Sequence, residues 1–428
     1  MLVITLILLL GLIALSVPIA AALGVLGLIM DQQFSMLPLT KAIGEISWST
    51  SNDFLLMAIP LFILLGEILL RAGFADKMYN AMSLWLSWLP GGLMHANIGA
   101  SALFSATCGS SVATAATVGT VAVPQLHKFG YNKSLFLGSI AAGGTLGILI
   151  PPSINLILYG VLTNTSVPKL YLAAFVPGML LALLFVIIIA LVCAAKPSFG
   201  GHRVEASWKA RIASLVDLLP PLGLFMLVVG SIYLGIATAT EASALGVLGS
   251  LFMAHSSKRL SWAMLTDALE GTMRSTVMVV LIVIAAAFLS FVMSSTGLTV
   301  TITDFIVGLH LSPELMLLII VVFYLILGCV METLSMMITT IPIIAPIMVA
   351  MGFDPVWLGI VIIILVEAAL ITPPVGINLF VVHSVSGGGT LSPIIKGSLP
   401  FVVAMLLLVL LLAVFPDIAL WLPSVFNG

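Results

Sequence analysis

Residues 147–153 read GILIPPS, and their two consecutive prolines interrupt a membrane-length apolar segment. A second interruption, ITPPVGIN at residues 371–378, follows 222 residues later. Each proline removes a backbone donor and clashes with the carbonyl one turn earlier, so a helix with two in succession must kink or break. Inside a bilayer the freed backbone groups are tolerated only where protein or a water-filled cavity receives them. Paired breaks in two halves of a chain therefore indicate a transporter with its site between them.

The composition is that of a multi-pass membrane protein. Of the 428 residues 61% are hydrophobic and 7% are charged, and the mean hydropathy is +1.31. Nearly the whole chain is therefore expected in lipid. A net charge of -2 and the scatter of the 14 Lys and Arg argue against a nucleic-acid partner. The sequence has no GxxxxGK[ST] motif and no long polar stretch, so we expect no nucleotide, no organic cofactor and no soluble domain.

Segments of about 20 apolar residues predict membrane helices. Two further apolar regions carry small polar residues at mid-depth and predict re-entrant hairpins, at 97–126 and 313–348. Each is followed by a predicted broken helix, at 134–163 and 356–384. The stretch 79–93, which contains two tryptophans, predicts an interfacial helix. The remaining spans are expected near 2–29, 54–72, 169–195, 214–236, 240–255, 275–295 and 397–422.

The two halves are related as repeats. A shift of 222 residues superposes Pro124 on Pro346 together with the double prolines. The loop at 128–133, which has two lysines, then corresponds to a loop at 351–355 without Lys or Arg. Because cytoplasmic loops are enriched in these residues, the two repeats are expected to insert in opposite orientations. We predict an all-α fold divided into an N-terminal scaffold helix with an interfacial connection (1–53), a first inverted repeat (54–195), a cytoplasmic loop with central scaffold helices (196–274) and a second inverted repeat (275–428).

Small polar residues accompany each break. The first hairpin reads TCGSSVAT at 107–114, and the second carries ETLS at 332–335 and Thr339-Thr340. The breaks add backbone carbonyls, several glycines, Thr372 and Asn378. Hydroxyl and carbonyl oxygens can replace the water shell of a monovalent cation. The alternative is that small residues only allow the helices to pack closely.

Four acidic residues are placed in or near apolar spans. Glu332 and Glu367 have hydrophobic neighbours in the sequence, and an ionisable group inside a span is a functional candidate because its insertion costs a few kcal/mol. For Glu367 the alternative is that it accepts hydrogen bonds from backbone donors freed at the nearby break. Glu67 and Glu241 lie nearer span ends, where we expect structural roles.

Three stretches resemble the large membrane subunit of tripartite ATP-independent periplasmic (TRAP) transporters: GTLGILIPPS at 144–153, GSSVAT at 109–114 and EAALITPPVGINLF at 367–380. The likeness extends over essentially the full length. It implies sodium-coupled uptake of an organic acid, such as a C4-dicarboxylate or sialic acid, across a bacterial inner membrane by an elevator-type movement. It also implies two partners, a small four-helix membrane subunit and a periplasmic substrate-binding protein.

The resemblance further implies a set of site residues. Sodium would be held in the first half by Cys108, Ser110, Gly147, Ile150 and Pro152, and in the second half by Glu332, Thr333, Thr372 and Gly376. Candidates for contact with the organic anion are Ser111, Thr114, Ser153, Glu332, Ser335 and Asn378. The chain departs from the family at two of these positions, because many members carry an aspartate where Thr114 and Glu332 stand. The first hairpin therefore lacks a carboxylate, and the second has a longer one.

Three other functions remain open at this point. A stand-alone divalent-anion/sodium symporter would use the same repeats without a binding protein. A passive channel would also use exposed carbonyls. An intramembrane enzyme would need hydrolytic groups at membrane depth, but neither GxSxG nor HExxH occurs in the sequence. We therefore predict a secondary transporter that is not an enzyme.

Overall fold

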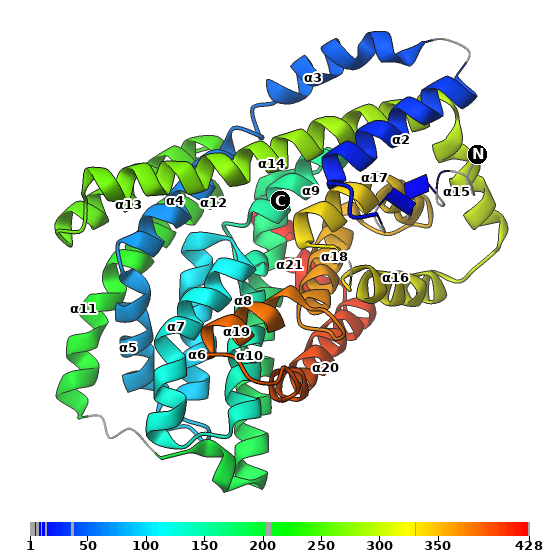
Figure 1. The fold of residues 1–428 in the computed structure, drawn as a ribbon. Coiled ribbons are helices and arrows are strands. Elements are labelled where there is room, and N and C mark those ends of the chain that lie inside the picture. The colour runs from blue at the N-terminus through cyan, green and yellow to red at the C-terminus, as the bar shows by residue number, and fades with distance from the viewer. Residues whose placement is uncertain are drawn as a thin grey trace.

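The structure is a computed structural model that describes residues 5, 8–9, 11–12, 15–35, 38–202, 207–329 and 331–426, without the side chains of Thr299 and Val307. Helices are the only regular elements of these residues (Figure 1). Among them, five helices are long and apolar enough to cross a membrane, or up to seven if each bent pair is one span. The predicted all-α polytopic fold class is confirmed. The main helices are α2 Ile19–Phe34, α3 Ile43–Ser51, α4 Ala58–Arg71, α5 Phe74–Leu86, α6 Leu93–Cys108, α7 Ser111–Phe129, α8 Lys133–Leu149, α9 Ile154–Thr163, α10 Val167–Ala195, α11 Trp208–Phe225, α12 Ser231–Tyr233, α13 Ala239–Ser256, α14 Trp262–Ser295, α15 Leu298–Gly308, α16 Pro313–Leu327, α17 Thr333–Ala350, α18 Pro355–Leu370, α19 Ile377–Val385, α20 Ser392–Val414 and α21 Asp417–Phe426.

Both predicted hairpins are present. In the first, α6 ends at Gly109, whose φ of +62° is left-handed and lets the chain reverse. Ser110 then begins α7 as its N-cap, because its hydroxyl accepts the N–H of Ala113 at 3.4 Å. In the second hairpin, the described residues between α16 and α17 are 328–329 and 331–332, and the Glu332 carboxylate caps α17. The described residues of these two connections, 108–111 in the first and 328–329 with 331–333 in the second, are called the first and second tips below.

Both double prolines interrupt helices as predicted. The first lies between α8 and α9, whose axes differ by 44°. Ser153 restarts the chain as the N-cap of α9, with its hydroxyl accepting the N–H of Leu156 at 3.3 Å. The second interruption separates α18 from α19 at residues 371–376. The Pro–Pro peptide bond is cis in both.

The two broken helices run in opposite directions. The loop before α8 pairs with the basic segment after α10, where the N–H of Asn132 donates to the carbonyl of Phe199 at 3.2 Å. At the other end, the Tyr159 hydroxyl of α9 donates to the carbonyl of Pro355 at 2.6 Å, so α18 begins where α9 ends. Gly389, in the loop after α19, lies next to the start of α8. The inverted orientation predicted from the charges is therefore confirmed.

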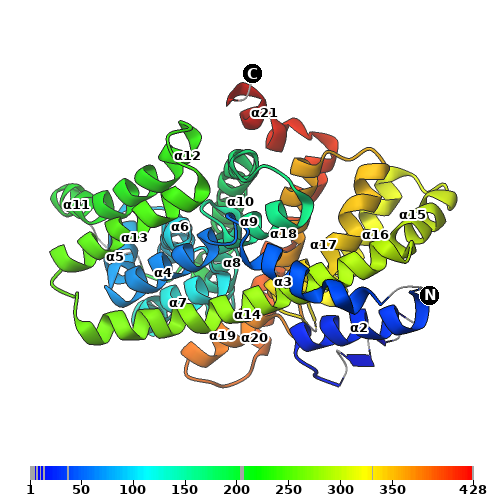
Figure 2. The ribbon, with the colours of Figure 1, turned by 90° about the horizontal axis from the view of Figure 1, so that it is seen from above.

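Helix α14 crosses the molecule and packs against several other helices (Figures 1 and 2). This helix packs against α2, α3, α4 and α17, and in both views it crosses the molecule beside the group formed by α6–α9. A second centre is α8, which packs against α6, α7 and α20 and is buried along almost its whole length. Gly138 of α8 faces Gly397 of α20, and a Cβ on either residue would overlap the backbone of the other helix. The α8–α20 crossing therefore depends on two glycines.

Helix α14 begins much earlier than predicted, at Trp262 rather than near residue 275. Ser261 caps it, and its first turns carry charges such as Glu270 and Arg274, which form an ion pair at 2.7 Å. A prediction based on hydropathy leaves such charged turns out of a membrane span, although in the structure they belong to the same helix. At 1.5 Å per residue the 34 residues extend about 51 Å, well beyond the roughly 30 Å hydrocarbon core.

Several other boundaries also differ from the predictions. The expected interfacial helix at 79–93 is α5, which is bent by 70° from α4 because Gly73 ends α4 in a left-handed conformation (φ +74°). The span expected at 397–422 is divided at Pro416 into α20 and α21. The span expected at 2–29 lies partly outside the described residues. Its longest described part belongs to α2, which begins after Pro18 and continues to Phe34. Helix α15 was not predicted.

Candidate functional site

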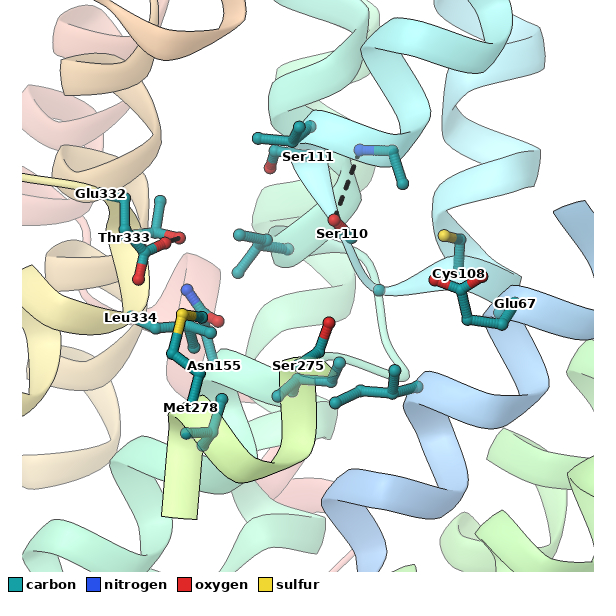
Figure 3. A pocket seen from close by; sticks show the side chains of 18 of the residues that line it. Glu67, Cys108, Ser110, Ser111, Asn155, Ser275, Met278, Glu332, Thr333 and Leu334 are labelled. Carbon is teal, nitrogen blue, oxygen red and sulfur yellow. Dashed lines mark hydrogen bonds between the residues drawn. The ribbon is translucent and has the colours of Figure 1, made fainter. Parts of the chain in front are cut away.

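A cavity of about 320 Å³ lies between the two tips (Figure 3). The first and second tips and the start of α9 form one part of its wall, and α4 and α14 form the other. Ser275 of α14 and Asn155 of α9 lie between the tips in Figure 3. The volume is at the lower end of the range for small-molecule sites. The cavity is therefore the candidate functional site.

Three helices begin at this cavity. They are α7 at Ser111, α9 at Ile154 and α17 at Thr333, and all three residues line the wall. The first N–H groups of a helix lack intrahelical partners, and the helix dipole makes this end positive. The site is thus suited to an anion. The α6 helix ends at Cys108 in the same wall, so its last carbonyls present negative charge to the first tip.

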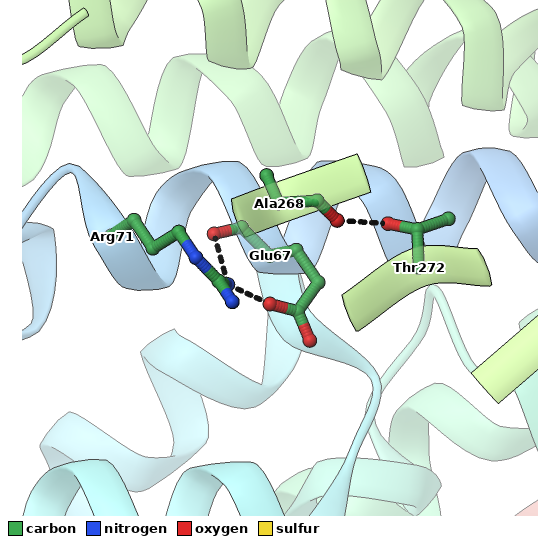
Figure 4. A network of polar contacts seen from close by, with 4 residues as sticks. All are labelled: Glu67, Arg71, Ala268 and Thr272. Atoms are coloured by element: carbon green, nitrogen blue, oxygen red, sulfur yellow. Dashed lines mark hydrogen bonds and ion pairs between the residues drawn. The ribbon is translucent and has the colours of Figure 1, made fainter. Parts of the chain in front are cut away.

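The cavity contains two carboxylates but, among the described residues that line it, no Lys, Arg or His. Glu67 of α4 forms an ion pair with Arg71 one turn later, beside Thr272 of α14 (Figure 4). A Cβ at Gly271 of α14 would lie 2.9 Å from the Glu67 carboxyl carbon, so α14 packs directly on this pair. Any positive potential for an anion must therefore come mainly from the helix N-termini.

Glu332 is the N-cap of α17. Its Oε1 accepts the Ser335 N–H at 3.0 Å and the Ser335 hydroxyl at 3.1 Å. The Thr333 hydroxyl lies 3.4 Å from the other oxygen, Oε2. These donors compensate part of the negative charge. The Oε2 atom keeps capacity for a further donor or a cation.

Asn155 presents an unsatisfied donor to the cavity. Its side chain is only 2% exposed, and its Nδ2 has no hydrogen-bond partner among the described residues. Buried polar groups are nearly always paired with protein or with ordered water. A ligand oxygen or a water molecule at this position would satisfy the amide.

The sodium candidates of the first half lie close together. Cys108 and Ser110 line the cavity. A Cβ on Gly147 would lie 2.9 Å from the backbone C and O atoms of Ser110, and one on Gly109 would lie 3.1 Å from the carbonyl oxygen of Pro152. Gly147 and Pro152 of the first break therefore lie against the first tip, whereas Ile150 between them does not line the cavity. Sodium binding by these residues stays a prediction.

The candidates of the second half are more dispersed. Glu332 and Thr333 line the cavity. Thr372 does not; its hydroxyl donates to the carbonyl of Ala368 at 2.6 Å. Gly376 adopts a left-handed φ of +60° at the start of α19 and is also absent from the cavity wall. Cys329 of the second tip has its sulfur 3.9 Å from the Pro373 carbonyl, so this tip also lies against its break.

Only two of the six substrate candidates, Ser111 and Glu332, line the cavity. The side chains of three others are used within their own helix turns. Thr114 donates to the Ser110 carbonyl at 2.7 Å, Ser153 caps α9, and Ser335 donates to Glu332. Hydroxyls in first helical turns commonly bond the nearby backbone in this way.

Asn378 lies outside this cavity. It is fully buried, and neither its Oδ1 nor its Nδ2 has a partner among the described residues. A Cβ on Gly144 would lie 3.1 Å from this Nδ2 and 3.1 Å from the Ser111 carbonyl oxygen. Its unsatisfied amide indicates a water or ion position behind the first tip.

Four features of the site were missed or only partly predicted. Asn155 directly follows the quoted break, and its position in the first turn of α9 was its one signal. Ser275 and the other α14 residues had no local signal. Glu67 was expected to be structural, and its ion pair agrees with this, but it also lines the cavity. Glu367 accepts a hydrogen bond from the Ser111 hydroxyl at 2.7 Å rather than from freed backbone donors.

Comparisons with known proteins agree over almost the full length. Residues 6–418 match the family model described as "Tripartite ATP-independent periplasmic transporter, DctM component". The C4-dicarboxylate TRAP transporter large permease protein DctM of Pseudomonas aeruginosa is 35% identical over 380 residues, which is 88% of each chain. The sialic acid TRAP transporter large permease protein SiaM of Vibrio cholerae is 30% identical over the same length and share of each chain. The crystal structure of the Alcanivorax borkumensis YdaH transporter matches in fold, with a TM-score of 0.63 at 15% identity over 96% of this chain and 98% of that one.

Proposed function

The chain belongs to the DctM family of tripartite ATP-independent periplasmic transporters, and from this we propose that it carries out sodium-coupled uptake of an organic acid anion. Members of this family are multi-pass proteins of the inner membrane. The proposal is carried by one observation, the convergence of three helix N-termini on a cavity enclosed by two hairpin tips. Half-helix N-termini meet anionic substrate groups in other secondary transporters.

The anion would be held by its carboxylate. The N–H groups at the starts of α7, α9 and α17 and the free amide of Asn155 are the available donors. The described lining residues include no lysine, arginine or histidine that could bind the anion instead. C4-dicarboxylates and sialic acid are the substrate classes that the relatives' names indicate.

Sodium would supply both positive charge and driving force. The carbonyls at the end of α6, the Ser110 hydroxyl and the Glu332 carboxylate are oxygen ligands of the kind that replace sodium's water shell. Each sodium ion moving inward gains about 2.3 kcal/mol per 100 mV of membrane potential. An anion and its coupling cations can thus share one cavity.

Alternating access would come from movement of the hairpins and broken helices past α4 and α14. The cavity wall is divided in this way, with the tips and α9 on one side and α4 and α14 on the other. In this elevator-type scheme the site crosses the membrane together with the moving hairpins and broken helices. A periplasmic binding protein would deliver the anion, and a small four-helix membrane subunit would complete the assembly, in keeping with the tripartite family.

Uptake measurements test the coupling and the partners together. In proteoliposomes that contain the chain with its membrane partner, we expect uptake of a labelled organic acid only with an inward sodium gradient and an added cognate binding protein. Dissipating the sodium gradient should abolish accumulation, and a negative interior potential should increase it. Equal uptake without the binding protein would favour the stand-alone symporter. Sodium-independent flux far above carrier rates would instead show a channel.

Two substitutions test the sodium ligands. We expect Ser110→Ala and Thr372→Val each to raise the sodium concentration for half-maximal uptake roughly tenfold, which corresponds to about 1.4 kcal/mol. Each removes one hydroxyl close to a break.

The matched controls remove the same kinds of hydroxyl group at positions away from the cavity. Ser312→Ala removes the N-cap hydroxyl of α16, and Thr120→Val removes a hydroxyl that donates to the carbonyl four residues earlier. Both controls should leave the sodium dependence unchanged. If Ser110→Ala and Thr372→Val also left it unchanged, the assignment of these ligands would be wrong.

A further inference from the structure

A buried carboxyl group joins the two inverted repeats. Glu367 of α18 is completely buried, and its only hydrogen-bond partner among the described residues is the hydroxyl of Ser111. Ser111, which is 2% exposed, is the first residue of α7 at the first tip. The two residues are 256 positions apart in the chain. This contact therefore links the first tip to the second repeat.

The geometry of the contact is best satisfied by two hydrogens. The Ser111 Oγ lies 2.7 Å from Oε1 of Glu367 and also 2.7 Å from Oε2. A serine hydroxyl has one hydrogen and can donate it well to only one of these oxygens. With an ionised carboxylate, this one hydrogen would be shared between the two oxygens, and each hydrogen bond would be weak. With a protonated carboxyl, one oxygen accepts from the serine and the other donates to it, which satisfies both contacts.

No ion pair among the described residues compensates an anion at this position. Among the described residues no cation forms an ion pair with Glu367; the two ion pairs involve Glu67 and Glu270. An ionised carboxylate buried without a cation is strongly unfavourable, and such a group binds a proton instead. The charged groups on α18 and on the helices packed against it lie mostly near helix ends: Asp354 at its N-cap, Lys133, Lys169, Glu314, Glu332, His383, Lys396 and Asp417. The other titratable groups there are the thiol of Cys193 and the phenols of Tyr159, Tyr171 and Tyr324, and the three phenols are used in hydrogen bonds with other groups.

We propose that Glu367 is a proton-binding site whose bound proton closes a two-hydrogen-bond ring with Ser111. The proton has a structural role, because it adds a second hydrogen bond between the first tip and α18. It differs from the coupling cation of the proposed function, because Glu367 itself does not line the cavity and its proton needs no ion gradient. The neighbouring Ser110 lines the cavity, so the two hydrogen bonds between Ser111 and Glu367 also stabilise this part of the cavity wall.

The test is infrared spectroscopy of the full chain in lipid nanodiscs at neutral pH. A protonated carboxylic acid has a carbonyl band above the amide and carboxylate bands, and this band shifts when water is exchanged for heavy water. We expect such a band in the unsubstituted chain and its loss in Glu367→Gln. In Ser111→Ala the band should move to higher frequency, because the carbonyl loses its hydrogen-bond donor.

Glu270→Gln is the matched control. Glu270 is exposed and paired with Arg274, so its substitution should change only the carboxylate region. Thermal unfolding supplies a second readout. Glu367→Gln is neutral and can both donate to and accept from Ser111, so it should unfold close to the unsubstituted chain, whereas Glu367→Ala should unfold at a clearly lower temperature.

Two results would overturn the proposal. One is an unchanged acid region in Glu367→Gln accompanied by loss of a carboxylate band, which would mean that the group is ionised. The other is a glutamine variant as unstable as the alanine variant, which would mean that a neutral donor and acceptor does not replace the acid. If Glu367→Gln did not fold, the band shift in Ser111→Ala would still decide the question.

Discussion

Replacement of Gly147 by valine is expected to abolish sodium-driven uptake in a chain that still folds and inserts. Even the Cβ atom would lie 2.9 Å from the backbone of Ser110 and from the N atom of Ser111. These are main-chain atoms of the first tip, which cannot rotate away as a flexible side chain would. The tip must therefore separate from the break, and with it the proposed cation ligands.

The expected loss in initial uptake rate is on the order of 100-fold, about 2.7 kcal/mol, which is within the usual range for overpacking. The measurement is uptake under an imposed sodium gradient, with gel filtration and thermal unfolding to show that the protein is intact. Gly223→Val is the control, because Gly223 lies in α11 with no atom within 4 Å of its Cβ position. Normal sodium-dependent uptake in Gly147→Val would show that close contact between tip and break is dispensable.

Replacement of Gly138 by valine should prevent the chain from folding stably. Helices α8 and α20 cross at Gly138 and Gly397, and the added carbon would overlap the backbone of Gly397. A Cβ on Gly397 would likewise overlap the carbonyl of Ser134. Both helices are long and packed on other elements, so neither can move away alone.

We expect the free energy of unfolding to fall by about 3 kcal/mol or more, at the upper end for overpacked sites. Yield of monodisperse protein and the unfolding temperature in detergent would measure this effect. The exposed-site variant Gly223→Val accounts for the change in helix propensity alone. A Gly138→Val protein with the same unfolding temperature as this control would contradict the crossing geometry.

The sequence identified those features that depend on local backbone chemistry. The double prolines located both breaks, and the small polar residues around Gly109 located the first tip, because proline and glycine act on the chain where they stand. The opposite orientation of the repeats followed from the lysines at 128–133. These properties need no knowledge of distant residues.

The features that were missed depend on distant parts of the chain. The Ser111–Glu367 contact joins residues from different repeats, and no periodicity points from one to the other. Ser275 enters the site because α14 passes the tips, which only the packed structure shows. Conversely, Thr114 and Ser335 had the residue types of a binding site, but their hydroxyls bond within their own helix turns. Residue type alone does not distinguish these uses.

The unusual length of α14 makes the surrounding bilayer a determinant of the site. Its apolar part, residues 275–295, extends about 31 Å and so matches an average hydrocarbon core, while the charged first turns continue the same rigid rod beyond it. In a thinner membrane such a rod relieves hydrophobic mismatch by tilting. Because Ser275 and Met278 line the cavity, tilting of α14 would change the shape of the cavity, and we expect that shape to depend on lipid acyl-chain length.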